Sequence, residues 1–595
     1  MRSSLLDRRS LLRGAALGGT GLVVANWYPA WAQPVSRGIA KPVPELSGDT
    51  ISLRIAQEMV SVDGRQAHVI AMNGTVPAPL LRLREGQAVR ITIDNALDEE
   101  TSLHWHGLLV PFQMDGVPGL SFPGIPAHST FTYKFPIQQS GTYWYHSHSG
   151  LQEAMGHYGP IVIDPKDADP IAYDCEHVVM FSDHSFVHPH TLFTKLKQDP
   201  GYYNRQKQTL AGLLAGRDQK HADRLAWARM RMDPTDILDV TGAAYTYVVN
   251  GYGPRDNWTA LFKPGERVRL RLINAAAMTI FNVRIPGLQM TVVAADGHPI
   301  RPVAVDELQM TIAETYDVIV TPTEDRAYTI VGEAIDRSGL ARATLAPREG
   351  MVGEVPPLRA RPVLTMRDMG MDMAGMDMPG SGGGTIDLSK PDAAAEGMEH
   401  GAAGGTASGA MSMKMRDPKN APQVVMGPGV QTIAPMPMDR TDEPGIGLEN
   451  ARHKVLVYRD LVALEPNPDA RAAAREIELH LTGNMERYMW SIDGQTLSES
   501  RTPIPLRTGE RVRMTLINDT MMNHPIHLHG HFFELVTGHG DHSPRKHTVN
   551  VPPGGKVSFD VTGIYGDWAF HCHMFLHMHA GMIRIVQVRD AGDAA

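Results

Sequence analysis

The chain has 595 residues and a formal net charge of −9, and its composition includes 33 Met, 27 His and 2 Cys. This length favours several domains over one. Two cysteines exclude a disulfide framework and any metal cluster built on several thiolates, so a metal site in this chain would depend on His and Met. Acidic and basic residues are spread along the chain without a basic tract, which argues against a nucleic-acid partner.

The first 32 residues are interpreted as an export signal. Arg8 and Arg9 form an arginine pair, a weakly apolar stretch follows over 14–25, and Ala-Trp-Ala at 30–32 fits a small-x-small cleavage site. This segment resembles a twin-arginine signal peptide of bacteria, which implies a periplasmic protein. The alternative is a membrane anchor, but the stretch is too short and too rich in Gly for a stable membrane span.

The body of the chain is predicted to be all-β, because short alternating runs are separated by Gly, Pro and Asn turns. One turn-and-strand unit, with Gly, Val, Arg and Asn at the same spacing, occurs three times, at 86–95, 265–274 and 509–518. Such repetition predicts three homologous β-sandwich domains of Greek-key type. Their expected limits are 45–165, 170–355 and 446–590. A stretch near 204–232 looks helical and is predicted to be an insertion in the second domain.

Matched His-x-His pairs follow the repeat in the first and third domains. Nine residues after the shared Asn come His104 and His106 in the first domain, and His527 and His529 in the third. A second matched register holds four more histidines, which are His146, His148, His571 and His573. The second domain has neither pair. Its His-x-His at 188–190 contains Pro189, lies upstream of the repeat, and is interpreted as a loop.

The four pairs predict a metal centre. Residues i and i+2 of a strand point to the same face, so each pair presents two imidazoles side by side. Imidazole suits copper, zinc, iron and nickel. The alternative, eight ordinary structural histidines, does not explain why the pairs recur at matched positions in two repeats.

A different ligand set is predicted around Cys572, which lies between His571 and His573. His577 follows five residues after Cys572, Met582 follows ten after it, and His524 lies three before His527. One Cys, two His and a distal Met make up the ligand set of a blue-copper electron-transfer site. The alternative is a buried, small apolar Cys. The corresponding positions of the first domain hold Ser147, Gln152 and His157, so a single blue site is expected.

Taken together, these motifs resemble the multicopper oxidases, and the resemblance covers all three domains. It implies cupredoxin-like domains and four copper ions per chain, with a three-copper cluster between the first and third domains. It further implies three groups of ligands: type 1, His524, Cys572, His577 and Met582; type 2, His104 and His527; type 3, His106, His146, His148, His529, His571 and His573. Electrons would enter at His577 and pass along Cys572 to reduce O2 to water.

Protons must also reach the cluster. Asp115 matches an acid that the family carries near the type 2 copper, although an Asp before Gly116 is also typical of a turn. Some relatives have a carboxylate directly after the type 1 His, where this chain has Met578. A proton route through that position is therefore in doubt here.

The methionines bear on the reducing substrate. Residues 356–445 are interpreted as a flexible linker, because Gly, Pro, Ala, Asp and Ser are frequent and hydrophobic periodicity disappears. Yet 13 of the 33 Met lie between Met366 and Met438, mostly in close pairs or triplets. Thioethers select Cu(I), whereas the alternative is compositional drift in a low-complexity loop.

With the export signal, this segment resembles the bacterial periplasmic copper-resistance multicopper oxidases. That resemblance implies an enzyme that oxidises Cu(I) with O2, with copper-handling proteins of the periplasm as partners. Two alternatives stay open: a copper-sequestering protein that stores Cu(I) in the Met-rich segment, and a laccase-like phenol oxidase. Cys175 is expected to be a free core thiol, and His539 and His542 are expected to be unrelated to the copper sites.

Overall fold

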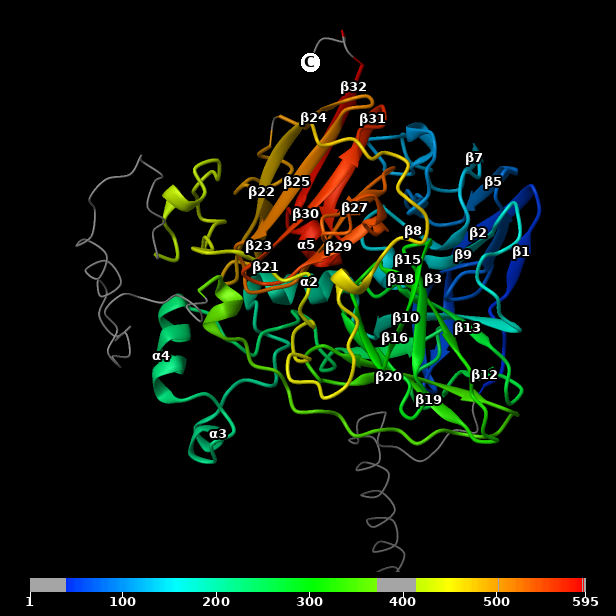
Figure 1. The fold of residues 1–595 in the computed structure, drawn as a ribbon, viewed down its shortest axis with the longest axis horizontal. Coiled ribbons are helices and arrows are strands. Elements are labelled where there is room, and N and C mark those ends of the chain that lie inside the picture. Colours follow the sequence, from blue (N-terminus) through cyan, green and yellow to red (C-terminus); the bar gives the residue numbers. More distant parts are fainter. Residues whose placement is uncertain (1–38, 372–413, 501, 591, 593–595) are drawn as a thin grey trace, which may run out of the picture.

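The computed structural model describes residues 39–371, 414–500, 502–590 and 592. They form six β-sheets, two for each of three β-sandwiches (Figure 1). The all-β, three-domain prediction is confirmed. In Figure 1 the first domain is blue to cyan, the second is mostly green, and the third is orange to red.

The first domain consists of a four-stranded sheet, β3-β2-β5-β7, and a five-stranded sheet, β1-β4-β9-β8-β6. Its strands are β1 (Glu45–Ser47), β2 (Thr50–Val62), β3 (Arg65–Met72), β4 (Leu80–Arg84), β5 (Ala88–Asn95), β6 (His104–His106), β7 (Thr130–Pro136), β8 (Gly141–His146) and β9 (Tyr158–Asp164). Two short 3-10 helices, η2 (Phe112–Met114) and η3 (Glu153–Met155), lie in its loops.

The second domain consists of a six-stranded sheet, β11-β10-β13-β18-β15-β16, and a five-stranded sheet, β12-β20-β19-β14-β17. Its strands are β10 (Cys175–Ser185), β11 (Tyr245–Val249), β12 (Thr259–Leu261), β13 (Val268–Asn274), β14 (Phe281–Arg284), β15 (Met290–Ala295), β16 (His298–Val305), β17 (Glu307–Met310), β18 (Thr315–Val320), β19 (Tyr328–Ala334) and β20 (Leu340–Ala346).

The third domain consists of one sheet with the order β23-β22-β25-β30-β27-β28, whose β30 also pairs with β21, and a second with the order β24-β32-β31-β26-β29. Its strands are β21 (Met438–Asp439), β22 (Arg475–Asn484), β23 (Met489–Ile492), β24 (Ile504–Arg507), β25 (Arg511–Asn518), β26 (His524–Leu528), β27 (Phe533–Leu535), β28 (Arg545–Lys546), β29 (Thr548–Val551), β30 (Gly555–Thr562), β31 (Gly566–Cys572) and β32 (Ile583–Arg589). The short helix α5 (Phe575–His579) follows β31, and η7 (Tyr458–Asp460) and η8 (Gly540–His542) lie in loops.

The Asn that ends each repeat has a common structural role. Asn95, Asn274 and Asn518 end the inner strands β5, β13 and β25, and all three side chains are buried. Each Oδ1 accepts a hydrogen bond from the backbone N–H two residues later, and each Nδ2 donates to at least two backbone carbonyls. The Asn therefore fixes the path of the chain toward the position nine residues on, where two of the domains carry His-x-His.

The helical insertion in the second domain is larger than predicted. It contains α2 (Pro189–Gln198), α3 (Leu210–Leu214) and α4 (His221–Met230). The prediction of a loop at 188–190 is wrong: His188 is the N-cap of α2, its side chain accepts a hydrogen bond from the backbone N–H of His190, and Pro189 occupies the first helical position. Proline is favoured there because that N–H has no partner within the helix.

The description of 356–445 as a flexible linker is wrong for its two described ends, because they pack on the body. Leu364, Met369, Val430 and Ile433 are buried, and Arg440 pairs with Asp368. The ends also contain η4 (Met366–Met369) and η6 (Pro418–Asn420). The central part of the Met-rich segment, 372–413, lies outside the described residues, as does the predicted signal peptide at 1–32.

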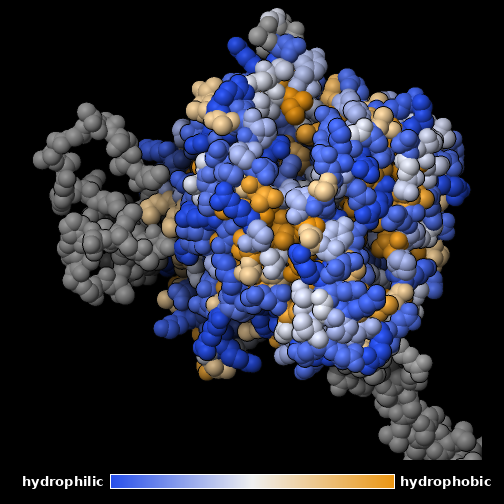
Figure 2. Space-filling view, turned by 45° about the vertical axis from the view of Figure 1, so that its right-hand side comes forward, coloured by the Kyte–Doolittle hydropathy of each residue, from blue (hydrophilic) through white to orange (hydrophobic). Residues whose placement is uncertain are grey.

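The two main hydrophobic cores each include residues from more than one domain. The larger runs through the second and third domains and includes Trp144 and Tyr158 of the first, whereas the core of the first domain includes Phe532 of the third. The face in Figure 2 is largely hydrophilic with small hydrophobic areas between. Among the described residues, no helix has the length and apolar character needed to cross a membrane.

Candidate metal centres

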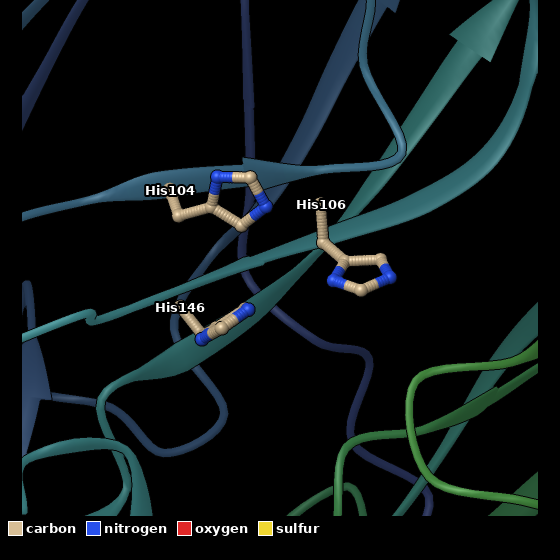
Figure 3. Close-up of side chains that lie close together, drawn as sticks. All are labelled: His104, His106 and His146. Atoms are coloured by element: carbon tan, nitrogen blue, oxygen red, sulfur yellow. The ribbon is translucent and has the colours of Figure 1, made fainter. Parts of the chain in front are cut away.

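Strand pairing brings the two His-x-His pairs of each outer domain together. In the first domain β6 pairs with β8 and places His104 opposite His146, and Figure 3 shows the rings of His104, His106 and His146 gathered in one place. In the third domain β26 pairs with β31 and places His527 opposite His571. The two registers found in the sequence are thus adjacent strands of one sheet in each domain.

The two domains then face each other through these histidines. The ring centroids of His104 and His529 lie 3.9 Å apart, and so do those of His106 and His527. His573 lies 4.9 Å from His106 and His148 lies 4.9 Å from His529, again between centroids. All eight predicted imidazoles therefore meet at the boundary between the first and third domains.

The outward ring nitrogen of most of these histidines is held by a protein oxygen. Nδ1 of His104 donates to the backbone carbonyl of Asp115 at 2.8 Å, and Nδ1 of His529 donates to Oδ2 of the same residue, also at 2.8 Å. Nδ1 of His527 donates to the carbonyl of His547 at 2.6 Å, and Nδ1 of His146 lies 2.8 Å from Oε2 of Glu153. Such partners fix the tautomer and the orientation of a metal-binding imidazole.

The inward ring nitrogens fit a set of bound metal ions. Six of them are buried without a hydrogen-bond partner, which are Nε2 of His104, His146, His148, His527 and His573 and Nδ1 of His106. Nε2 of His529 and of His571 face each other at 3.1 Å. Buried polar atoms are seldom left unsatisfied, so the arrangement is suited to cations that the inward nitrogens would coordinate.

Electrostatics also suits metal binding, because burial and the neighbouring histidines lower the pKa of several of the imidazoles. The pKa of His106, His146, His527 and His529 lies well below its usual value, and that of His571 falls to about 3, again mainly through burial. The rings are therefore neutral at physiological pH and available as ligands.

The second centre lies around Cys572 and is built by β26, β31 and α5. Sγ of Cys572 lies 3.5 Å from Nδ1 of His524 and 3.7 Å from Nδ1 of His577, and the two nitrogens are 3.2 Å apart. Met582 is buried, and its backbone hydrogen-bonds to both Cys572 and His577. Burial raises the pKa of the Cys572 thiol, which a bound metal ion would deprotonate.

The outward nitrogens of this centre are held as well. Nε2 of His524 lies 2.8 Å from the hydroxyl of Thr520, and Nε2 of His577 lies 2.7 Å from Oδ2 of Asp239 in the second domain. The indole of Trp490 stacks on the His577 ring at 3.9 Å. Both imidazoles thus direct Nδ1 toward Cys572, which is the arrangement that a Cys-His-His copper site requires.

Comparison with known proteins decides the family. Three sequence profiles described as multicopper oxidase match residues 54–168, 213–349 and 471–592. Copper resistance protein A of Escherichia coli is 46% identical, over 98% of this chain and 99% of that protein. The chain belongs to the multicopper oxidase family. It is therefore a copper-binding oxidoreductase that uses O2 and a reducing substrate.

More distant relatives agree with this assignment. Multicopper oxidase MmcO of Mycobacterium tuberculosis is 28% identical over 90% of this chain and 86% of that protein. Among solved structures, Fet3p, a multicopper oxidase that functions in iron import, is similar with a TM-score of 0.59, at 19% identity over 91% of this chain and 90% of that chain. The latter shows the same cupredoxin-like fold.

Asp115 bridges the two outer domains of this multicopper oxidase. It is buried beside His104 of the first domain and His529 of the third, and its Oδ1 makes no hydrogen bond. The turn alternative also holds, since the Asp115 N–H donates to Phe112 at the end of η2, and Gly116 has a φ of 87°. One residue therefore shapes the turn and faces the histidine cluster.

Several residues around the centres could not be identified from the sequence. Four residues, Asp239, Glu153, Thr520 and Trp490, contact predicted ligands but belong to no motif. Asp239 lies in the second domain, for which no ligand was predicted. His547 is a partial exception: it forms a cluster with His106 and His527, and His547 and Thr548 make a hydrogen-bonded contact with His106. An excess of His near a His-rich motif was the one signal that could have found it.

The first domain has a hydrogen-bonded cluster where the third has its Cys-centred site. Oε1 of Gln152 accepts hydrogen bonds from Thr101 at 2.7 Å and Ser147 at 2.9 Å, and Nδ1 of His157 lies 3.3 Å from it. Thr101 lies three residues before His104, as His524 lies three before His527. Three of the four positions of the copper ligand set thus hold side chains, Thr101, Ser147 and His157, that contact Oε1 of Gln152 at the fourth, while Nε2 of His157 is buried without a partner.

The remaining predictions concern residues away from the centres. Both cysteines are free, but the expectation of a core thiol is wrong for Cys175. It is half-buried at the start of β10, where its Sγ lies 3.6 Å from Oε2 of Glu266. His539 and His542 hydrogen-bond to the backbone carbonyls of Arg459 and Ala463.

Proposed function

We propose that this multicopper oxidase is an exported enzyme of copper resistance that oxidises Cu(I) with O2 as acceptor. Two relatives that are 46% and 47% identical over nearly their full length are a copper resistance protein A and a homologue of it. The Met content between 366 and 438 supports Cu(I) as the substrate, because thioethers select Cu(I). The observation that supports the oxidase assignment most strongly is that the Cys572 site and the histidine cluster are joined through three consecutive residues, 571–573.

The copper ligands are proposed residue by residue on the geometry above. The electron-accepting site would be held by His524, Cys572, His577 and Met582, and the cluster by His104, His527, His106, His146, His148, His529, His571 and His573. Copper bound there would supply one-electron redox chemistry, passing four electrons to O2 to give water. Because His571 and His573 flank Cys572 in the chain, one short covalent path links the two centres.

The protein's own residues would fix the ligands and supply protons. Asp239 and Thr520 hold the outer nitrogens of His577 and His524, so both rings keep one orientation during electron transfer. Asp115 has one carboxyl oxygen free of hydrogen bonds beside His104 and His529. We assign Asp115 as the group that carries protons to the cluster at this oxygen.

The cover over His577 disfavours a laccase-like function. The His577 side chain is fully buried, its Nε2 is occupied by Asp239, and its ring face lies against Trp490. Tyr488 closes the same side and donates a hydrogen bond to Asp239. A phenol cannot touch this imidazole without rearrangement of the cover, so electrons must enter through these side chains.

Oxygen consumption tests the proposal against copper storage. We expect the holoenzyme to consume O2 with Cu(I), a variant lacking 372–413 to turn over Cu(I) more slowly, and Cys572→Ser to be inactive. Cu(I) binding without O2 consumption would identify a storage protein. Unchanged Cu(I) turnover after the deletion would disprove delivery by the Met-rich segment, and normal O2 consumption by Cys572→Ser would disprove the electron path.

Export is proposed on the arginine pair at the start of the chain. Arg8→Lys together with Arg9→Lys should leave the protein in the cytoplasm, because twin-arginine signals are read by a receptor. Cell fractionation with an antibody to the chain measures this. Periplasmic copper-handling proteins are the proposed partners.

A further inference from the structure

The second domain contributes no proposed copper ligand, yet one of its carboxylates lies close to the cluster. Asp296 follows β15 in a turn with Gly297 and is fully buried. A Cβ on Gly297 would lie 2.1 Å from the Tyr143 hydroxyl, and one on Gly141 would lie 2.3 Å from the Gly297 carbonyl. This turn is therefore pressed against the first domain while its carboxylate faces the third.

The two oxygens of Asp296 have separate partners. Oδ1 accepts a hydrogen bond from the backbone N–H of Thr315 at 3.0 Å, which holds the side chain within its own domain. Oδ2 accepts from the backbone N–H groups of His547 at 3.1 Å and Thr548 at 3.2 Å. One carboxylate thus joins the turn of the second domain to the start of β29 in the third.

The start of β29 in turn holds two proposed copper ligands. The His547 carbonyl accepts the Nδ1 hydrogen of His527 at 2.6 Å. Nδ1 of His547 and Oγ1 of Thr548 each lie 3.1 Å from Nε2 of His106. The position of this backbone therefore sets where His527 and His106 can point.

A buried ion pair locks Asp296 in place. Nζ of Lys546 lies 3.1 Å from Oδ2 of Asp296 and 3.1 Å from Oε1 of Glu314, and all three side chains are fully buried. Glu314 also accepts hydrogen bonds from the hydroxyls of Tyr458 and Tyr316. Removing one partner would leave a charge buried without compensation, which resists any displacement of Asp296.

We propose that Asp296 is a positioning residue for the copper cluster, which it acts on through His547 and Thr548 to orient His527 and His106. The inference rests on the proposed assignment of those two histidines as ligands. It gives the second domain, which supplies no proposed ligand, a part in positioning the ligands of the cluster. Loss of such an outer contact typically lowers metal affinity by about 10- to 100-fold.

The test is copper retention by the full-length holoenzyme carrying Asp296→Asn. The Asn side chain has one oxygen. If that oxygen accepts from the donors around Oδ2, the NH2 group must face the Thr315 N–H, and two donors then point at each other. The amide also lacks the negative charge that pairs with Lys546. We expect the chelator concentration that removes type 2 copper, read by electron paramagnetic resonance, to fall by about 10-fold or more. The blue absorption of the Cys572 site should stay.

Asp317→Asn is the matched control. Asp317 is buried in the same domain and pairs with Arg269 and Arg271, so its loss should destabilise the domain without selective loss of type 2 copper. Thr548→Val removes the hydroxyl beside His106 with little change in volume. It should change the absorption band of the type 3 copper pair, which lies at shorter wavelength than the blue band. It remains informative if Asp296→Asn does not fold.

Equal retention of type 2 copper by Asp296→Asn and the wild type would overturn the proposal. So would equal loss in Asp296→Asn and Asp317→Asn, or, if Asp296→Asn does not fold, an unchanged type 3 spectrum in Thr548→Val. A wild-type protein without a type 2 signal would instead contradict the ligand assignment on which the inference rests. The two failures are therefore distinguishable.

Discussion

The first and third domains place different side chains on the same scaffold, and the difference decides which one can bind a blue copper. In the third domain His524, Cys572 and His577 converge within 3.7 Å of one another. At the matching positions of the first domain, Thr101 and Ser147 converge on Gln152 and each donates a hydrogen bond to its Oε1, at 2.7 and 2.9 Å. The backbone supplies convergence in both, and the donor atoms determine whether a metal or a polar cluster fills the space.

The change with the largest expected effect converts the third domain toward the first. Cys572→Ser replaces the thiolate by the side chain present at Ser147, and a hydroxyl is a poor ligand for copper in such a site. We expect the blue absorption to vanish and O2 consumption to fall to the level of copper-free protein. Absorption spectra and an oxygen electrode measure both.

Cys175→Ser is the control for this substitution, since Cys175 lies half-buried beside Glu266 in the second domain. It should keep the full blue absorption. A blue Cys572→Ser protein would mean that the two scaffolds differ in more than their donor atoms.

Asp115 joins the two domains and carries the next largest expected effect. Asp115→Asn keeps an oxygen that can accept the hydrogen bond from His529 but cannot donate a carboxyl proton. Proton transfer by a positioned side chain contributes about 100-fold or more to a rate, so kcat should fall by about that factor with copper content unchanged. Steady-state kinetics together with metal analysis measures this, and a kcat within twofold of the wild type would remove Asp115 from the proton route.

Features that recur in the sequence, such as the His-x-His pairs, could be predicted, whereas contacts that occur once between domains could not. The His-x-His registers were visible because a strand has a period of two and because the repeat occurs in both outer domains. The pairing of β6 with β8 and of β26 with β31, which brings the two registers of a domain together, is seen only in the structure. Asp239 and Asp296 were not visible, because each acts across a domain boundary from the ligand-free domain. Such contacts depend on how the sandwiches pack, which leaves no local pattern in the sequence.

The polar cluster of the first domain makes a prediction about stability. Gln152→Leu removes the acceptor shared by Thr101 and Ser147, and leaving buried donors unsatisfied costs about 1–3 kcal/mol. We expect a loss of about 2–3 kcal/mol in the free energy of unfolding of this domain, with the blue absorption of the third domain retained. Urea denaturation measures it, and Gln423→Leu, at an exposed position, should change stability by less than about 0.5 kcal/mol. If Gln152→Leu had no effect on stability, packing rather than hydrogen bonding would stabilise the positions that match the copper ligands of the third domain.

The smallest expected effect concerns His157, which stands where the third domain has Met582. Burial lowers the pKa of His157 to about 3, whereas an unfolded His titrates near 6.5. Between these values the unfolded chain binds a proton that the folded chain does not, so the stability of the copper-free protein falls as the pH falls from 6.5 toward 3, by about 1.4 kcal/mol per pH unit from this one group. His157→Gln should therefore reduce the loss between pH 6.5 and 5 by about 2 kcal/mol, measured by urea denaturation with pH 8 as the reference. Of the four side chains in this polar cluster, Thr101, Ser147, Gln152 and His157, only His157 titrates. If His157→Gln left the pH dependence of stability unchanged, the folded cluster would have to take up a proton itself. It would then resemble a metal site in binding a cation as well as in its position.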